Sequence, residues 1–551
     1  MFRRHRFLAA AILLVLCATL LHWGTLDDGL FLDDVAIYGG LGLARDGVPG
    51  AHWWDVYFLG GYDERLRFSG ALPWWIAEGV QLHFFRPVAA GTHYLDVLLW
   101  PDSPRAMHVH NLAWFGATGG AAAWLYRDAL KTRREALLAL AVFMLAYVHE
   151  WPVQWLAARN SQMALAFGVC SLIGFRRWNE GRRWRVLAAT GLGLSLLSSE
   201  LGVSVLALVV GQECVRRGES RSGRWPRLGL ALGVTAVWRI GYVLGGYGAL
   251  GSGTYIDPLS APLAFLRVAP ERLLMQALSL VGPPELLVHP AVPLALRAVL
   301  WALGVVALVL VFRTLRDWSL RGWALGAMLC LAPLVSSVPQ PRLLGFVVLG
   351  LAPLVARALV SGWSRGVRGR LGVGVVALHQ LVLGPLVVTG ALDGLRPSDI
   401  SAFGEPGTTL GDLEGRNLFL LNQSTYATAK MLVAVRTERG LSMPAFAWAL
   451  GVGDDVTITR EGCCTVVVSS PTGLFRERWA AMYRGPQVPF QEGDVVKTLS
   501  FEAQVRDVTS WGYAKEVAFV MTGPLRSPQF VFARWNGRDY QVVSPREIPR
   551  R

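Results

Sequence analysis

Residues 7–34 read FLAAAILLVLCATLLHWGTLDDGLFLDD, an apolar run that ends shortly before a pair of aspartates. The apolar part, about 7–23, is long enough to cross a hydrocarbon core of roughly 30 Å as a helix. The basic stretch Arg3–Arg6 precedes it. We therefore expect an uncleaved signal anchor that serves as the first membrane span and places Asp33 and Asp34 just outside the membrane.

The composition agrees with a membrane protein. Of 551 residues, 53% are hydrophobic and only 17% are charged, and the mean hydropathy is +0.39. The net charge of +14 would point to nucleic acid in a soluble protein. Here most of the excess arginine falls in short loops between apolar runs, where membrane orientation and anionic lipid explain it better. No basic nucleic-acid motif is present, and we expect membrane lipid rather than nucleic acid as a partner.

Placing each arginine-rich loop in the cytoplasm predicts about eleven transmembrane helices, with the N-terminus inside and the C-terminus outside. Residues 186–215 lie between two basic loops, and we divide them near Glu200 into two helices too short to cross an average bilayer squarely. A glutamate at that depth is unfavourable unless it is paired. The expected spans are about 7–23, 106–126, 135–149, 161–175, the two halves of 186–215, 228–247, 291–312, 322–338, 343–360 and 371–390.

Two domains follow from this pattern. Residues 1–394 are a transmembrane domain with a large first loop, 24–105, outside the membrane. In the tail, 395–551, apolar runs shorten to strand length and turn residues interrupt them. We thus expect an α-helical polytopic membrane protein with a small, β-rich α+β domain at its C-terminus, outside the cytoplasm.

Several elements of the tail are predicted individually. Asn536-Gly537 separates two runs of β-branched and aromatic residues, which is a strong signal for a hairpin. Helices are expected near 425–438 and 474–484. Cys463 and Cys464 are adjacent, so either a disulfide between neighbours or burial in a strand accounts for them. The tail has no dense cluster of acid, base and cation, and we expect it to be accessory.

Asp33 and Asp34 are the first candidates for catalysis. Transfer from a lipid phosphate to a hydroxyl needs a carboxylate to deprotonate or orient the acceptor, or to hold a metal ion. Two solvated loop acids are the alternative, and composition alone favours it. The neighbouring pair Asp27-Asp28 shows how ordinary such acids are.

Further residues of the predicted outer side are candidates for binding a phosphate or a substrate. An arginine beside the membrane is always charged and binds phosphate with two hydrogen bonds. Helix capping and anchoring at the membrane surface are the alternative interpretation. These candidates are Arg86, His93, His149, Arg159 and Arg342.

Scattered motifs, in this order, resemble the GT-C superfamily of polytopic glycosyltransferases. They are closest to its protein O-mannosyltransferase-like branch, in a bacterial form without tetratricopeptide repeats. The likeness covers about 25–360, and each motif is weak alone. The residues that carry it are Phe31-Leu-Asp-Asp34, Phe85-Arg-Pro87 with His93 to Asp96, His108-Val-His-Asn111, His149 with Trp155 to Arg159, Leu196-Leu-Ser-Ser-Glu200, and Pro339 to Leu344.

The resemblance implies a polyprenyl-phosphate-linked sugar as donor and an acidic residue of the first loop at the catalytic centre. Asp33 and Asp34 match that acid, and Arg159 and Arg342 fall where relatives carry basic groups near the donor phosphate. The chain departs from the family at two positions, where Trp151 replaces a common acid and Ser199 a common lysine. No metal site is predicted and no cofactor is certain, although a divalent cation stays open.

The leading hypothesis is therefore a membrane glycosyltransferase of the bacterial inner membrane. It would move a sugar from a polyprenyl phosphate to a protein, lipid or glycan acceptor on the outer face. The alternative is a non-catalytic membrane protein that binds lipid-linked glycan or scaffolds envelope assembly. A transporter is a third possibility. A transporter should carry charges at mid-membrane and paired broken helices in its two halves, and only the hairpin over 186–215 and Arg239 match this expectation.

Overall fold

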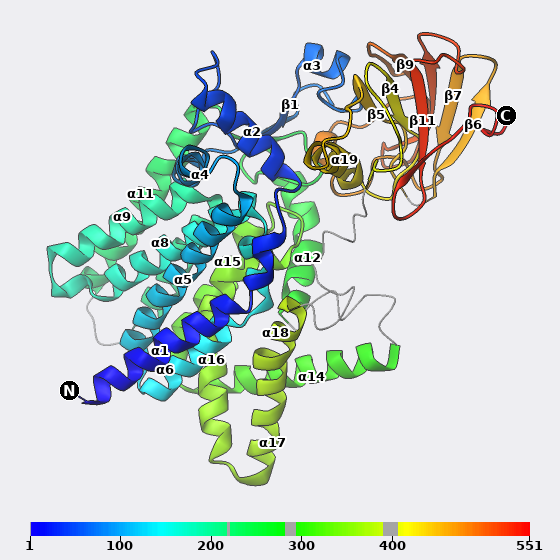
Figure 1. The fold of residues 1–551 in the computed structure, drawn as a ribbon. Coiled ribbons are helices and arrows are strands. Elements are labelled where there is room, and N and C mark those ends of the chain that lie inside the picture. The colour runs from blue at the N-terminus through cyan, green and yellow to red at the C-terminus, as the bar shows by residue number, and fades with distance from the viewer. Residues whose placement is uncertain (1, 217–220, 281–293, 390–405, 454) are drawn as a thin grey trace.

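Most of the chain up to residue 389 is helical, and a β-rich domain follows it (Figure 1). The computed structural model describes residues 2–216, 221–280, 294–389, 406–453 and 455–551. The predicted domain boundary near 395 lies outside these ranges. The fold class is thus confirmed in its coarse form, as a mostly helical part with several apolar helices and a β-rich C-terminal domain.

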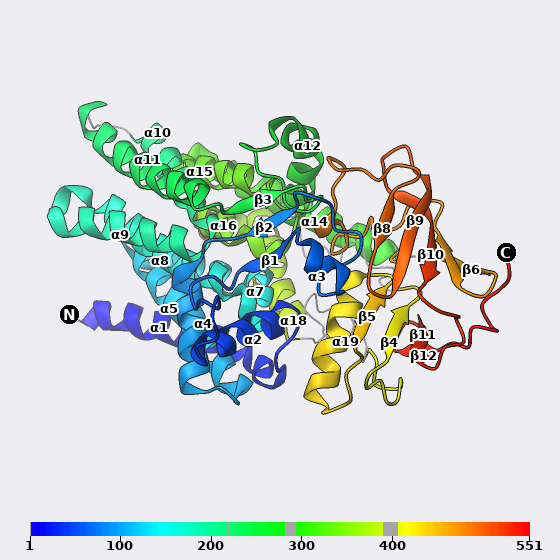
Figure 2. The same cartoon turned by 90° about the horizontal axis from the view of Figure 1, so that it is seen from above.

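The helical part contains a bundle of helices and further helices beside it (Figures 1 and 2). The helices of the bundle are α1 (Phe2–Leu20), α5 (Pro104–Ala129), α6 (Arg133–Met144), α8 (Arg159–Arg176), α9 (Arg182–Ser198), α10 (Val203–Val215), α11 (Arg221–Leu244), α14 (Leu294–Phe312), α15 (Trp318–Leu334), α16 (Gly345–Trp363), α17 (Gly366–Ala377) and α18 (Leu383–Val388). The further helices are α2 (Asp33–Arg45), α3 (Glu64–Phe68), α4 (Pro87–Leu99), α7 (Glu150–Gln154) and α12 (Pro262–Ser279).

By length and composition, fewer helices than the eleven expected qualify as membrane spans in the part of the chain that the structure describes. Within the described ranges, four helices are long and apolar enough, or five if the bent pair α6 and 147–154 counts as one span. The count of eleven is therefore not confirmed. Length is part of the reason, because α9, α10 and α15 have 17, 13 and 17 residues, whereas a span needs about 20. α5 and α8, with 26 and 18 residues, instead lack a sufficiently apolar stretch.

The predicted break in 186–215 is confirmed. α9 ends at Ser198, a single 3₁₀ turn covers Glu200–Gly202, and α10 begins at Val203. α10 then packs closely on α15 through small residues. A Cβ on Gly211 would lie 2.3 Å from the backbone nitrogen of Gly326, so the two backbones touch where neither residue carries a side chain.

Segments predicted to share one side of the membrane contact one another. The first loop pairs with the 248–290 segment through β2 (Gln81–His83) and β3 (Gly248–Leu250). On the other side, Lys131 lies 3.0 Å from Asp317, and both belong to predicted inner loops. The structure thus agrees with the predicted grouping of loops into two faces, whichever face is the cytoplasmic one.

In its described residues, 406–453 and 455–551, the tail contains two sheets and one α-helix. A four-stranded sheet has the order β12-β11-β4-β5, and a five-stranded antiparallel sheet has the order β6-β7-β10-β9-β8. Helix α19 (Tyr426–Glu438) connects the parallel strands β4 and β5. The strands are β4 (Asn417–Leu420), β5 (Phe446–Ala449), β6 (Thr457–Glu461), β7 (Thr465–Ser469), β8 (Val495–Lys497), β9 (Phe501–Val508), β10 (Ala514–Met521), β11 (Phe530–Trp535) and β12 (Tyr540–Val542).

The predictions for the tail are confirmed in part. β11 and β12 form the expected antiparallel hairpin around Asn536-Gly537, and α19 matches the helix predicted near 425–438. The helix predicted over 474–484 is wrong, because only the 3₁₀ turn Ala481–Tyr483 forms there. Phe475 and Trp479 are instead held by tertiary packing in a core of large aromatic residues. Of the two alternatives for Cys463 and Cys464, the structure has the disulfide, in the turn between β6 and β7.

The first loop and the tail share one hydrophobic core. The side chains of Trp74 and Trp75, both in the first loop, are completely buried. Their indole nitrogens donate hydrogen bonds to the carbonyls of Ala449 and Ala480, each at 3.0 Å, and Trp75 stacks on Phe475 at 4.3 Å. Two segments more than 370 residues apart therefore fold as one unit beside the bundle.

Candidate active site at the junction of the bundle and the tail

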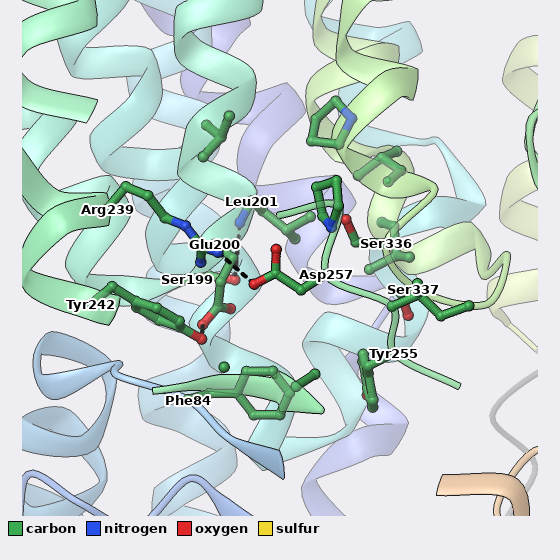
Figure 3. A pocket seen from close by; sticks show the side chains of 18 of the residues that line it. Phe84, Ser199, Glu200, Leu201, Arg239, Tyr242, Tyr255, Asp257, Ser336 and Ser337 are labelled. Carbon is green, nitrogen blue, oxygen red and sulfur yellow. Dashed lines mark hydrogen bonds and ion pairs between the residues drawn. The ribbon is translucent and has the colours of Figure 1, made fainter. Parts of the chain in front are cut away.

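A cavity of about 480 Å³ lies at the end of the bundle that carries β1 (Phe58–Gly61), β2 and β3 (Figure 3). Its walls come from α11, from the break between α9 and α10, and from the segments around Asp257 and Ser336. Most of the lining is apolar. The charged residues that line it are Arg86, Glu200, Arg239, Asp257 and Arg342, which leaves one net positive charge.

Two of the three arginines are neutralised by acids. Arg86 contacts Glu200 through its Nε and Nη2 atoms, at 2.9 and 2.7 Å from the same carboxylate oxygen. Tyr242 donates a hydrogen bond to the other oxygen of Glu200 at 3.1 Å, and Arg239 lies 2.5 Å from Asp257 (Figure 3). Glu200 is thus paired, as its position between two short helices requires.

Arg342 is the third arginine and differs from the others. Its Nε atom donates to the side-chain oxygen of Gln340 at 2.5 Å, and its guanidinium lies 5.0 Å from the centre of the Trp155 ring. In the part of the chain that the structure describes, no carboxylate oxygen lies within 4 Å of it. A cation that faces an apolar cavity without an acid is suited to an anionic group of a ligand.

Asp33 and Asp34 form the first turn of α2, where the helix dipole favours negative charge. Leu32, just before them, has a φ of 50°, which is strained for a leucine. Asp33 is 8% exposed and Asp34 is fully buried. The strained entry into α2 therefore holds both acids in buried positions, and of the two only Asp33 keeps a small exposed fraction.

Asp34 is held by the backbone. Its carboxylate accepts hydrogen bonds from the amide of Ala157 at 2.6 Å and from the amide of Phe31 at 3.3 Å. Burial raises the pKa of Asp34 to about 8, and these two backbone hydrogen bonds only partly oppose it. Such an acid is largely protonated at neutral pH, so its geometry indicates a role in fixing α2 against the turn after α7.

Asp33 meets a residue of the tail. The ammonium of Lys430, on α19, lies 3.5 Å from Oδ1 of Asp33 and 5.7 Å from the centre of the Tyr483 ring. Asp33 and Arg86 are also near enough to Arg342 to act on its charge. The first-loop acid, a lysine of the tail and the cavity arginine thus form one electrostatic neighbourhood.

The remaining predicted site residues lie in the interior. His93 is fully buried between the hydroxyls of Tyr38 and Tyr57, at 2.9 and 3.1 Å. Burial, followed by the charge of Arg159, lowers the pKa of His93 well below its usual value, so the ring is neutral. His149 is buried as well, 2.9 Å from the carbonyl oxygen of Phe143.

Arg159 is fully buried and lies 2.6 Å from Asp96, and it also donates to the carbonyl of Met107 at 3.0 Å. Burial alone would raise the pKa of Asp96, but the hydrogen bond to His110 and the charge of Arg159 lower it. Of the five predicted binding residues, Arg86 and Arg342 line the cavity and the other three are bonded within the protein.

Sequence reasoning missed Lys430, because no local pattern around it predicts a contact with the first loop. Its one signal is rarity, since the chain has four lysines among 53 basic residues. Tyr242 was also missed, as a tyrosine near the end of an apolar run is common at membrane interfaces. Across the described ranges, no group of three or more His, Cys, Asp or Glu side chains is arranged to hold a metal ion.

No protein-family model and no curated protein sequence matches this chain. Among solved structures, it is similar to the oligosaccharyltransferase AglB from Archaeoglobus fulgidus in complex with an inhibitory peptide and a dolichol-phosphate. The TM-score is 0.44, with 12% identity over 81% of this chain and 65% of that one. For the crystal structure of the Archaeoglobus fulgidus oligosaccharyltransferase tethered to an acceptor peptide, the TM-score is 0.43, with 11% identity over 81% of this chain and 64% of that one.

It is also similar to ArnT from Cupriavidus metallidurans bound to undecaprenyl phosphate, with a TM-score of 0.39 and 12% identity over 92% of this chain and 97% of that one. The chain spans less than two thirds of the archaeal enzyme. All these TM-scores are below 0.5, and the likeness carries no argument about function.

Proposed function

We propose that this chain is a glycosyltransferase of the bacterial inner membrane. It moves a sugar from a polyprenyl-phosphate donor to a protein, lipid or glycan acceptor on the outer face. The observation that carries the proposal is Arg342, a guanidinium without an acidic partner in the described chain, in an apolar cavity of about 480 Å³. The apolar walls suit a prenyl chain, and the single net positive charge suits a phosphodiester.

The reaction then follows from the groups around the cavity. The oxygen of an acceptor hydroxyl attacks the anomeric carbon of the sugar as the bond from that carbon to the phosphate oxygen breaks. The hydroxyl proton passes to Asp33, and the bonding electrons leave with the polyprenyl phosphate. Arg342 stabilises the charge that builds up on this phosphate, and the configuration at the anomeric carbon inverts.

The residues divide into two groups by burial. Asp33 is the proposed base because it keeps a small exposed fraction, which Asp34 does not, and has a cation, Lys430, beside it. Asp34 supports it from the interior. Arg86 and Arg342 serve the donor, whereas His93, His149 and Arg159 act through packing and hydrogen bonds in this proposal.

A binder of lipid-linked glycan would use the same cavity and is the second candidate. The proposed base, Asp33, distinguishes the enzyme from the binder, because binding a phosphate does not require a carboxylate beside it. Comparing the envelope glycans and glycoproteins of cells with and without the gene by mass spectrometry would identify the sugar and the acceptor.

The decisive assay is transfer of labelled sugar from the matching polyprenyl phosphate by the purified protein. Arg342→Ala should weaken donor binding and also lower turnover, because a phosphate contact acts in the ground state and in the transition state. Arg267, an exposed arginine of α12, provides the matched control as Arg267→Ala. Tight donor binding without turnover in the unmodified protein, under every donor and acceptor tested, would favour the binder.

A further inference from the structure

A second cavity, of about 390 Å³, is lined in part by the beginning of α17. Figure 1 shows that this end of α17 lies far from the tail. The walls of the cavity come from the 3₁₀ turn Arg313–Arg316, from α16 and from the start of α17. We call it the arginine cavity, because its charged lining consists of one acid and five arginines, namely Asp317, Arg313, Arg316, Arg357, Arg365 and Arg368.

The acid of the arginine cavity is already neutralised. Asp317 lies 3.0 Å from Lys131 and 3.3 Å from Arg357. Arg357 in turn lies 2.9 Å from Glu135. These three ion pairs join the beginnings of α6 and α15 to α16. The charge of Asp317 is therefore already paired and does not neutralise the other arginines of the cavity.

The other four arginines of the cavity lack an acidic partner in the part of the chain that the structure describes. In the described ranges, no carboxylate lies within 4 Å of Arg313, Arg316, Arg365 or Arg368. All four side chains are exposed, so they are free to move onto a ligand. Like charges gathered around one hollow repel each other, and an anion that enters it lowers the electrostatic energy.

The inner wall of the cavity is apolar. Leu310, Val373 and Val376 form it, and Val376 is 1% exposed. Just outside, Val367 and Leu371 on α17 expose 73% and 67% of their surface. Positive charge at a hollow with apolar surface beside it is the arrangement that recognises a lipid head group near the membrane surface. Trp363, exposed at the same end of α16, is of the type that lies at such a surface.

We propose that the arginine cavity binds the phosphate-bearing head group of an anionic phospholipid. The shared chemistry is a phosphate between several guanidiniums, and the apolar surface of α17 selects the lipid over a free phosphate. The site lies on the face that the arginine-rich loops assign to the cytoplasm. The inference is independent of sugar transfer, since neither Asp33 nor the cavity around Arg342 takes part.

The test uses purified full-length protein in neutral detergent, to which diphosphatidylglycerol, phosphatidylglycerol or phosphatidylcholine is added. Native mass spectrometry counts retained lipids, and thermal unfolding gives the shift caused by each. We expect retention and a raised midpoint with the anionic lipids alone. In R313Q/R365Q/R368Q the affinity should fall on the order of a hundredfold, roughly fivefold for each charge near a lipid surface.

The matched control is R182Q/R183Q/R185Q, which removes three arginines from another predicted inner loop. It should retain anionic lipid within about fivefold of the unmodified protein. An equal loss in both triple variants would overturn the site, because attraction would then come from the whole basic face. Equal stabilisation by inorganic phosphate would overturn the assignment to a lipid. The single variants R365Q and R368Q, at exposed positions, keep the test valid if the triple variant is unstable.

Discussion

The ammonium of Lys430 lies 3.5 Å from the carboxylate of Asp33, so a residue of the tail reaches the acid of the first loop. Burial alone would lower the pKa of Lys430, but the neighbouring Tyr483 and Asp33 raise it, and the lysine is therefore charged. The tail, expected to be accessory, in this way adds a cation to the proposed active site. The ion pair of Asp33 with Lys430 in turn depends on the docking of the tail against the first loop.

Lys430→Met should lower turnover by about tenfold, because it removes the cation that lies beside the proposed base. Lys430→Arg, which keeps the positive charge, should restore most of the rate. Transfer of labelled sugar measures both variants. Unchanged turnover in a folded Lys430→Met protein would limit Lys430 to a role in docking.

Asp33→Asn should remove about 10²–10⁴-fold of the turnover, which is typical for the loss of a general base. Asp33→Asn/Asp34→Asn should be at least as inactive, while the protein stays in the membrane. Asp27→Asn is the matched control in the same loop, since Asp27 is exposed and pairs with the exposed Arg105 at 3.1 Å. Transfer of labelled sugar measures all three, and normal turnover in the double variant would move the assignment to a glycan-binding protein.

Ionisation of Asp34 should lower the free energy of unfolding of the protein as the pH rises. The pKa of Asp34 is raised from 3.8 to about 8 by burial, so the folded state holds a proton that the unfolded state releases. This contribution is complete below about pH 4 and is lost as pH rises through about 8, at no more than about 1.4 kcal/mol per pH unit. Thermal midpoints between pH 5 and 9 should depend less on pH in Asp34→Asn. Parallel curves for the two proteins would contradict the assignment.

Trp75→Ala should destabilise the unit of first loop and tail by about 3–5 kcal/mol, as for other buried aromatic side chains replaced by alanine. Trp54→Ala is the control, because Trp54 is in the same loop but 39% exposed. Limited proteolysis should release the tail from Trp75→Ala more readily than from Trp54→Ala. Equal protection in the two variants would show that the tail folds without the tryptophan.

Arg159→Ala should act on stability more than on donor binding. It removes the charged partner of the buried Asp96, and breaking a buried ion pair costs about 3–5 kcal/mol. Arg105→Ala, which breaks the exposed pair with Asp27, should cost little. The check is the thermal midpoint together with the affinity for polyprenyl phosphate. A stable Arg159→Ala protein with weak donor binding would return Arg159 to the phosphate site predicted from sequence.

Local patterns in the sequence determined much of the architecture. Apolar runs gave the helices, Asn536-Gly537 gave the hairpin, and the two short helices around Glu200 were read from the basic loops on either side. Each of these depends on residues close together in the chain, because helices and tight turns are stabilised by neighbours. The count of eleven spans is not confirmed, since hydropathy alone does not show where a helix ends.

The composition of the site was decided by tertiary structure. Arg159 and Arg342 are alike in sequence, each beside an apolar run on the predicted outer face, yet one is bonded to Asp96 and the other faces a cavity. Lys430 reaches Asp33 because Trp74 and Trp75 anchor the first loop in the core of the tail. Whether a charge is paired depends on contacts between residues tens to hundreds of positions apart, and only the folded chain brings such residues together.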